Sequence, residues 1–577
     1  MDPDIMQRGG SKQKAAKLAA KVQPPIPEPS KLATHLLRSF GWGRMSLPQV
    51  QLVAALVEED VPREHLKPQI RLLASLGNRG QYPANLRRDL LRHTKMPSFS
   101  STSVFVPIKK SVRTSIPFLD PYEVFRTIQL DHPRVFKECI CRSASEVADF
   151  WQHVGSHPAV RHHPVKSITG YEFRAIPLVL HGDGVPIDSK DRSCAFISWR
   201  SLLSSQTSSK LAHVLITAVW TEQIVVSPCG NTVASIWGHV VRAFERAFEE
   251  GKRNSEFFPV LLFLTGDLEW YNTSHNLPRW NSNYPCGHCG INKNQMFEYK
   301  NVPEVPVDPW QLPRRSCCPL LRQLVSPSGV IPDWMHSKHL GFDQRLAGAV
   351  LWYLCWKILP GGIEQNLDEV LLQMKAYWRQ HKGNGINSLT QTMVLADPQD
   401  VHCRRGYPRL KAKAAETKGV IAALASICQQ HLQHDNVEQE QIALAVNFSR
   451  DLDEMADGIQ GWKPTKDVAD RMMLTAVCLF QCMTCLNKSF LSQGHLAFQL
   501  TFKTHWFLHG LQLARHLSPK LTSTYSGEDY MSKCKGLLKT CTRSRSMLTS
   551  LHRFMQQYSD AMSIELAEIL EQPGPPL

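Results

Sequence analysis

The sequence lacks a long, uninterrupted apolar run. Its most hydrophobic stretch, Met472 to Leu486, is shorter than the roughly 18 to 20 apolar residues that span a bilayer, and it contains Gln481. We therefore expect a buried helix there and no membrane partner. A secretory hydrophobic region at the start of the chain is also missing, and the 16 cysteines are scattered. This distribution favours thiols or metal ligands in a reducing compartment over a disulfide framework.

The chain also lacks an internal repeat and an extreme charge. Its 66 Lys and Arg exceed its 51 Asp and Glu, giving a net charge of +15, and the pI is about 9.1. This excess favours a polyanionic partner, with nucleic acid ahead of an acidic membrane surface. With 577 residues, of which 43% are hydrophobic, the chain can bury a sizeable core and should divide into about three or four units.

Composition and hydrophobic periodicity change along the chain and divide it into eight expected segments. The first is too polar and Pro-rich to order itself, and is read either as a solvated tail or as a nuclear-targeting one. The segments are a tail at 1–30, a small helical unit at 31–95, a linker with buttressing helices at 96–170, the first part of an α/β core at 171–270, a Cys/His-containing segment at 271–345, a helical insertion at 346–500, the C-terminal part of the core at 501–560 and a tail at 561–577.

The central stretch has the clearest order of elements. Apolar runs predict strands at 175–187, 193–203 and 211–220, helical spacing predicts a helix at 232–253, and a fourth strand is predicted at 257–267. Three antiparallel strands, a crossover helix and a fourth strand parallel to the first form the heart of the RNase H-like fold. We therefore expect an α/β protein with an RNase H-like core, interrupted by a large all-α insertion and preceded by a small helical unit.

Two aspartates follow the first and fourth of these strands. Asp183 stands in His-Gly-Asp-Gly and Asp267 in Thr-Gly-Asp-Leu. Because the two strands are neighbours in the expected fold, their carboxylates would lie together and could hold Mg²⁺, which prefers oxygen ligands. A pair of such ions can activate an attacking hydroxyl and stabilise the leaving oxygen of a phosphodiester, although a third acid is needed. The competing interpretation is an ordinary turn residue after a strand.

Cysteine and histidine motifs come after the fourth strand. Cys286-Gly-His-Cys289 can grip one Zn²⁺ from a tight loop, and a distant His such as His336, in Asp-Trp-Met-His, could supply a third ligand. The coordination set stays open, because other candidates are present, namely His288, Cys317 and Cys318. A pair of loop cysteines without metal is the competing interpretation.

A second histidine pair occurs late in the chain. His505 and His509 stand at i and i+4 in Thr-His-Trp-Phe-Leu-His, where two imidazoles on one helix face could bind a metal. Their surroundings are strongly apolar, so the expected role is packing. We do not predict them as ligands.

The succession of HGDG, LTGD, CGHC and DWMH resembles the DDE transposases of the CACTA (En/Spm-like) group over roughly residues 170 to 545. The resemblance assigns Asp183 and Asp267 to the first and second catalytic acids and matches Cys286, Cys289 and His336 to the motif elements of the family. It also implies a final Glu on a late helix, after a long helical insertion. Glu528 is the predicted third acid. Its competing role is to stabilise a helix N-terminus, and the other candidates are Asp529, Glu438, Glu440 and Glu454.

The resemblance implies an enzyme with two Mg²⁺ or Mn²⁺ ions, and Zn²⁺ at the Cys/His motifs. It would act in the nucleus, as a monomer or a homo-oligomer, nicking DNA at element ends and joining the freed 3′ hydroxyl to target DNA. Basic residues of the later helices, among them Lys411, Lys413, Arg543 and Arg545, would neutralise phosphates.

The N-terminal region lacks the paired Cys/His clusters of a zinc-finger DNA reader. A catalytically inactive, transposase-derived DNA-binding or scaffold protein is therefore the alternative function. An RNase H-like nuclease acting on RNA or on a hybrid is the second alternative.

Overall fold

A computed structural model of the chain describes most of the sequence. The expected tail at 1–30 lies outside the described residues except for Ser30, and Cys317 also lies outside them. The described residues are 30–76, 87–88, 90, 99–109, 111–188, 192–227, 230–254, 256–299, 302, 318–543 and 545–571. They fall into two compact units, Met1–Pro97 with Ser563–Leu577, and Ser98–Met562.

The first unit is helical, as its periodicity predicts. Its helices are α2 (Lys31–Gly41), α3 (Leu47–Asp60), α4 (Pro68–Ser75) and the last turns of α24 (Met547–Glu571). Ser30 caps α2 by accepting a hydrogen bond from the backbone N–H of Ala33. Glu565 of α24 accepts a hydrogen bond of 2.7 Å from the indole of Trp42. The expected tail at 561–577 is therefore wrong for its described part, because residues 561–571 continue α24 and Ile564 packs into this core.

The second unit contains a mixed six-stranded sheet with the order β1-β2-β5-β4-β3-β8. The predicted α/β class is confirmed. Strands β3, β4 and β5 pair antiparallel, and β8 pairs parallel with β3 after the crossover through α12. The bounds are β1 (Thr102–Ile108), β2 (Ser111–Phe118), β3 (Ala175–Pro186), β4 (Ser193–Ser201), β5 (Val214–Trp220), α12 (Thr232–Arg253) and β8 (Phe258–Thr265), with a separate pair β6 (Val226–Ser227) and β7 (Gly230–Asn231).

The hairpin β1–β2 corrects the prediction of a linker at the start of 96–170. Its Ser, Thr and Pro content suggested a loop, yet Val104, Val106 and Ile108 are buried at the period of two that a strand requires. Pro107 is tolerated because β1 is the edge strand, and Pro117 because β2 pairs with β5 only at Phe118.

Helices on both faces of β3 position the candidate site. A Cβ at Gly182 would collide with Trp270 of α13 (Leu268–His275), whereas a Cβ at Gly527 of α23 (Tyr525–Cys541) would lie 2.6 Å from His181. Since successive strand residues point to opposite faces, α13 and α23 pack on opposite sides of β3.

Shorter helices surround the sheet. They are α6 (Pro121–Asp131), α7 (Pro133–Val135), η2 (Phe136–Ile140), α8 (Ala144–Val154), α9 (Pro158–Arg161), η3 (Pro164–Ser167), α10 (Tyr171–Arg174), α11 (Ser209–Ala212), η4 (Thr221–Gln223), α14 (Pro319–Gln323), η6 (Pro327–Gly329) and α22 (Pro519–Thr522).

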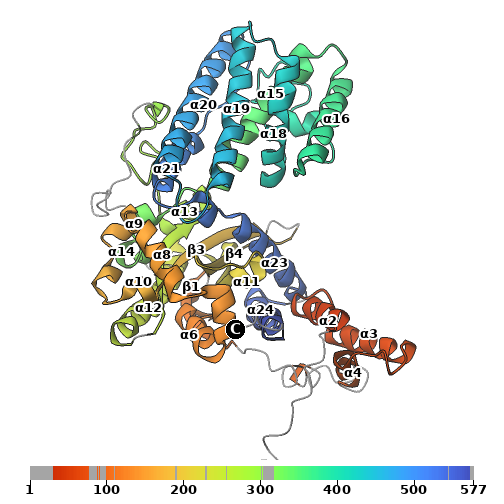
Figure 1. The fold of residues 1–577 in the computed structure, drawn as a ribbon, viewed down its shortest axis with the longest axis vertical. Coiled ribbons are helices and arrows are strands. Elements are labelled where there is room, and N and C mark those ends of the chain that lie inside the picture. Colours follow the sequence, from red (N-terminus) through yellow and green to blue (C-terminus); the bar gives the residue numbers. More distant parts are fainter. Residues whose placement is uncertain are drawn as a thin grey trace, which may run out of the picture. The chain divides into compact units, whose positions relative to one another are not determined.

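The later helices form a block with its own hydrophobic core (Figure 1). In the described chain, α20 is the one helix whose length and composition would suffice to cross a membrane, and its buried side chains recur at helical spacing within this core. The block comprises η7 (Met335–Phe342), α15 (Asp343–Tyr353), η8 (Leu354–Ile358), α16 (Ile363–His381), α17 (Gln391–Val394), α18 (Ala414–His431), α19 (Val437–Gly458), α20 (Lys466–Ser492) and α21 (Phe502–Ala514).

Candidate functional site

Asp183 and Asp267 come from neighbouring parallel strands. The register pairs His181 of β3 with Thr265 of β8, and each aspartate lies two residues beyond that pair. Asp183 accepts a hydrogen bond of 2.7 Å from the N–H of Gly184, and Asp267 caps α13 by accepting one of 2.6 Å from the N–H of Trp270. The strand order thus brings both carboxyl groups to the same end of the sheet.

Glu528 approaches the same strand end from α23. The close packing of Gly527 on His181 lets the helix lie directly against β3. Glu528 Oε1 lies 3.8 Å from His181 Nε2 and 3.9 Å from His336 Nε2. This oxygen is buried and has no hydrogen-bond partner. A third acid, Glu528, therefore lies near the ends of the two strands. Its Oε1 is a buried acceptor that receives no hydrogen bond.

The charges of these acids act on one another. Burial, then the charges of Glu528 and Asp267, raise the pKa of Asp183 to about 8. Burial also raises the pKa of Glu528, although His336 opposes that shift. Such mutual repulsion is relieved when a cation enters, so the carboxyl groups of Asp183, Asp267 and Glu528, called the acid cluster below, could hold divalent metal.

Asp333 links His336 to the start of α23. It accepts hydrogen bonds from His336 Nδ1 at 2.8 Å, and from the N–H and hydroxyl of Thr524 at 2.9 and 2.7 Å. Burial lowers the pKa of His336, but the negative charge of Asp333, together with those of Glu528 and Asp267, raises it. The pKa of His336 is about 9 as a result. Asp333 therefore orients both a protonated imidazole and the helix turn that carries Glu528.

The prediction of His336 as a ligand beside Cys286 and Cys289 is wrong. The two cysteines instead meet His505 and His509 of α21, and one donor atom from each of the four lies within 4.8 Å of the others. The predicted packing role of these histidines agrees with their burial, but it did not include their meeting with the two cysteines. The i, i+4 spacing was the available signal.

Two sulfur and two nitrogen donors make a set that fits tetrahedral zinc. Cys289 Sγ lies 3.4 Å from His505 Nε2 and 3.3 Å from His509 Nε2. His509 Nδ1 lies 2.8 Å from Gln512 Oε1, and donation to that oxygen leaves Nε2 free to ligate. Hydrogen bonds from Cys286, and then from the histidines, keep the pKa of Cys289 far below its usual range despite burial. We call these four residues the Cys₂His₂ cluster.

The remaining candidates have other surroundings. His288 stacks on Trp506 with ring centroids 4.6 Å apart, and Cys318 is buried. Asp529 turns away from the acid cluster and accepts a hydrogen bond of 2.5 Å from Ser209. The three glutamates of α19 have other partners: Glu438 binds Ser489 and Gln493, Glu440 binds His434, and Glu454 binds Arg450.

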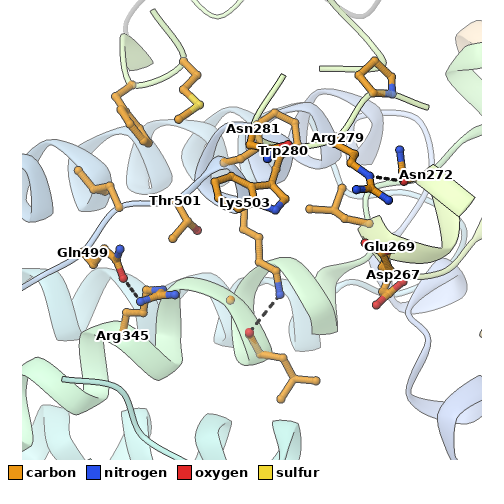
Figure 2. Close-up of a pocket in the computed structure, with 18 of the residues that line it drawn as sticks. Asp267, Glu269, Asn272, Arg279, Trp280, Asn281, Arg345, Gln499, Thr501 and Lys503 are labelled. Carbon is orange, nitrogen blue, oxygen red and sulfur yellow. Dashed lines mark hydrogen bonds between the residues drawn. The ribbon is translucent and has the colours of Figure 1, made fainter. Parts of the chain in front are cut away.

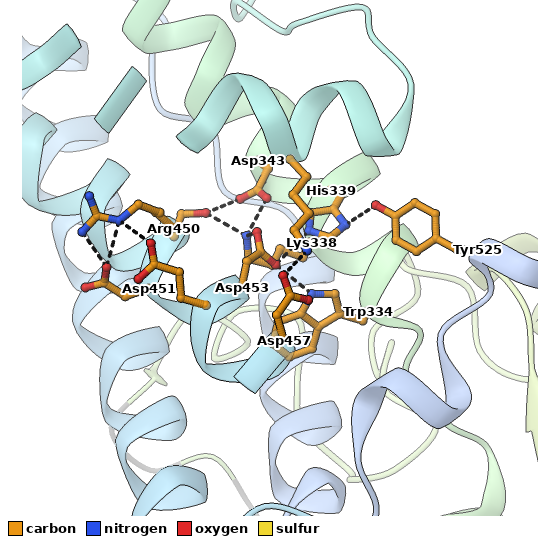
Figure 3. A network of polar contacts seen from close by, with 12 residues as sticks. Trp334, Lys338, His339, Asp343, Arg450, Asp451, Asp453, Asp457 and Tyr525 are labelled. Carbon is orange, nitrogen blue, oxygen red and sulfur yellow. Dashed lines mark hydrogen bonds and ion pairs between the residues drawn. The ribbon is translucent and has the colours of Figure 1, made fainter. Parts of the chain in front are cut away.

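A third buried group, His339, Asp343 and Asp453, has metal-like spacing but already contains a cation (Figure 3). Lys338 Nζ lies 2.8 Å from Asp343 and 2.7 Å from Asp453. Tyr525 of α23 contacts His339 Nδ1 at 2.7 Å. Because an ammonium occupies the position that a metal would need, we assign this group, the Lys338 network, to structure.

Comparison with models of known protein families finds no match to this chain, and no curated protein matches it.

Proposed function

We propose that the chain is a transposase-like nuclease that cuts DNA with divalent metal held by Asp183, Asp267 and Glu528. The observation that carries this proposal is the meeting of three mutually repelling carboxyl groups at the ends of β3 and β8 and on α23. The order β5-β4-β3-β8, with β8 parallel to β3, supports an RNase H-like core in this proposal. The resemblance to the CACTA group, with the same order of motifs, supports DNA as substrate and the nucleus as location.

In this proposal, the acids and the residues around them have separate roles. Asp183 and Asp267 approach from the strand ends, and Glu528 offers its unpartnered Oε1. Two bound Mg²⁺ or Mn²⁺ ions would supply the charge that activates the attacking hydroxyl and stabilises the leaving oxygen. Asp333 holds the first turn of α23 through Thr524, and His336 adds a positive charge beside Glu528. Helix α23 thereby keeps the third acid in place.

Strand cleavage of labelled DNA with Mg²⁺ or Mn²⁺ tests the proposal. Asp183→Asn and Glu528→Gln should abolish cleavage. Asp529→Asn should retain it, because Asp529 is on the same helix but binds Ser209. Cleavage that survives Asp183→Asn and Glu528→Gln would refute the site. DNA binding without any cleavage would favour the inactive scaffold, and preference for RNA or a hybrid would favour the RNase H-like alternative.

We further propose that the Cys₂His₂ cluster holds one structural Zn²⁺. Its four buried donors join the segment after α13 to α21. Metal analysis of purified protein should find about one zinc per chain. Cys289→Ser and His509→Ala should lose it, whereas His336→Ala and the buried-thiol control Cys428→Ser should keep it. Full zinc content in both ligand variants, or none in the unsubstituted protein, would refute this assignment.

A further inference from the structure

A pocket of about 570 Å³ opens beside the acid cluster (Figure 2). Asp267 lines this pocket, and its walls come from four parts of the second unit: α13 with the segment after it, the start of the helical block, the loop before α18, and the segment that leads into α21. A ligand in this pocket would therefore reach from one of the proposed catalytic carboxylates toward the helical block.

Four basic side chains face this pocket, Arg279, Arg345, Arg409 and Lys503. Their hydrogen bonds go to neutral oxygens: Arg279 donates to Asn272, Arg345 to Gln499, Arg409 to Gln344 and Lys503 to the carbonyl of Leu340. Within the described part of the chain, none of the four forms an ion pair with a carboxylate. The four cations outnumber the two carboxylates that line the same pocket, Asp267 and Glu269, and an excess of like charge in a concave site favours a bound anion.

An exposed aromatic ring stands at the same pocket. Trp280 is 64% exposed although it is a large apolar side chain, and it follows Arg279 directly. Figure 2 draws Trp280 and Lys503 among the residues that line this pocket. Basic grooves with exposed aromatic faces are the usual means of holding single-stranded nucleic acid, because a base can stack on the ring while the phosphates meet the cations.

A second pocket, of about 800 Å³, continues the first. The two share Arg345, Arg409 and Gln499, and the second adds Lys411 and Lys413. Together the pockets present six basic side chains against three acidic ones, Asp267, Glu269 and Glu416. We call this continuous feature the basic groove, lined by Arg279, Arg345, Arg409, Lys411, Lys413 and Lys503.

We propose that the basic groove binds an unpaired DNA strand that leads away from the acid cluster, with one base stacked on Trp280. This inference rests on the proposed function for its choice of DNA. A pocket of about 570 Å³ suits one or two nucleotides, and a base within a duplex has both faces covered by its neighbours. The strand opened at the acid cluster is the polyanion that can present both a free base and successive phosphates.

Fluorescence anisotropy with the full chain tests the groove, using a labelled single-stranded oligonucleotide and the matching duplex. Divalent ions are left out, so that binding is measured apart from cleavage. Trp280→Ala should weaken binding of the single strand about tenfold or more and change duplex binding little. The control is Phe173→Ala, which removes another exposed aromatic ring, 50% exposed in α10, and should change neither.

Salt dependence tests the cations separately. Arg345→Gln and Lys503→Gln should each lower the slope of log affinity against log salt for the single strand by about 0.7, the value for one lost phosphate contact. Lys488→Gln, which removes an exposed lysine of α20 outside both pockets, should leave the slope unchanged. Lys503→Arg should restore it, which separates lost charge from damaged folding.

Two results would overturn the inference: single-strand affinity unchanged in Trp280→Ala and Arg345→Gln, or an equal loss for single strand and duplex. The proposed function fails on a different result. If wild-type protein shows no metal-dependent cleavage but Trp280→Ala still loses single-strand binding, the groove stands and the nuclease assignment falls. If cleavage depends on Asp183 while Trp280→Ala binds normally, the groove falls and the nuclease assignment stands.

Discussion

Two buried groups of carboxylates in the second unit differ in how their charge is balanced. In the Lys338 network, one ammonium lies between Asp343 and Asp453, while Ser449 donates to Asp343 at 2.6 Å and Trp334 to Asp453 at 3.1 Å. The network therefore supplies its own counter-charge and most of its own hydrogen bonds. Buried charges arranged in this way support a fixed packing of η7, α15 and α19 and leave no position for a ligand.

The carboxyl groups of the acid cluster are less well balanced by positive charge and hydrogen bonds. Its three carboxyl groups repel one another, the pKa of Asp183 is raised to about 8, and Glu528 Oε1 has no hydrogen-bond partner. Repulsion between these carboxyl groups lowers the stability of the fold, and a bound cation would remove that repulsion. The comparison teaches that the number of acids in a buried group matters less than whether the chain supplies their counter-charge.

The largest effect is expected on catalytic activity, and only for substitutions in the acid cluster. Asp267→Asn should reduce metal-dependent cleavage by at least about a thousandfold, because several kcal/mol of charge stabilisation in the transition state are lost. The melting temperature should stay the same or rise, since one repelling charge is gone. Cleavage rates and differential scanning calorimetry on the same preparation check this. A marked fall in melting temperature would mean that the acid cluster is structural after all.

The next effect concerns stability. Lys338→Met should destabilise the fold by about 3 to 5 kcal/mol, because Asp343 and Asp453 would be left buried without their cation. Lys418→Met is the matched control: it breaks a partly exposed pair with Asp457 and should cost at most about 1 kcal/mol. Urea unfolding measures both. Similar losses in the two variants would contradict the description of the Lys338 network as a buried counter-ion.

A smaller effect is expected at the link between His336 and α23. Thr524→Val removes the hydroxyl that donates to Asp333 at 2.7 Å, a bond to a charged acceptor worth about 2 kcal/mol. Glu528 would then be held less firmly, so cleavage should fall about tenfold. Thr540→Val, which removes a hydroxyl that donates to the Leu537 carbonyl and also contacts Cys541 Sγ, should leave the rate unchanged. Equal rates for the two variants would argue against a positioning role for Asp333.

The smallest effect is a difference in pH dependence. Without added Mg²⁺ or Mn²⁺, the folded protein keeps a proton on Asp183 that the unfolded chain releases, because its pKa is raised from 3.8 to about 8. This contribution to the free energy of unfolding therefore falls as pH rises from about 4 to about 8. Asp453 has the opposite sign. Its pKa is lowered by Lys338 and His339 despite burial, so its stabilisation is present above about pH 4 and is lost as pH falls.

Urea unfolding at several pH values without divalent ions checks this contrast. Asp183→Asn should flatten the decline between about pH 5 and about pH 8, and should leave the loss of stability in acid unchanged. An unaltered slope in Asp183→Asn would show that the acids repel one another too weakly to influence folding.

The strands and the crossover helix of the sheet could be predicted from local sequence. The helix predicted at 232–253 has those same bounds in α12, and the runs at 175–187, 193–203, 211–220 and 257–267 contain β3, β4, β5 and β8. Each is a continuous apolar run or a clear helical period, so burial of its own residues decides its structure. The hairpin β1–β2 was missed because its Ser, Thr and Pro content outweighed a weak alternation.

The site was only partly predictable. Asp183 and Asp267 could be paired from the order of strands, and Glu528 from the resemblance together with its place at the start of a helix. His336 was assigned to the cysteines because both motifs follow the fourth strand. In the structure, however, it forms a hydrogen bond with Asp333 and lies beside Glu528. Sequence spacing does not specify which of several distant histidines shares a cavity with a given cysteine pair.

Local sequence was enough to predict which segments bury their side chains, and hence the sheet, its crossover helix and the two aspartates at its strand ends. Contacts between residues far apart in the chain follow from tertiary packing. It placed His505 and His509 at Cys289, Lys338 between two aspartates, and Arg345 in one groove with Trp280. Periodicity is a property of neighbouring residues, whereas charge balance and ligand sets arise where distant segments pack together.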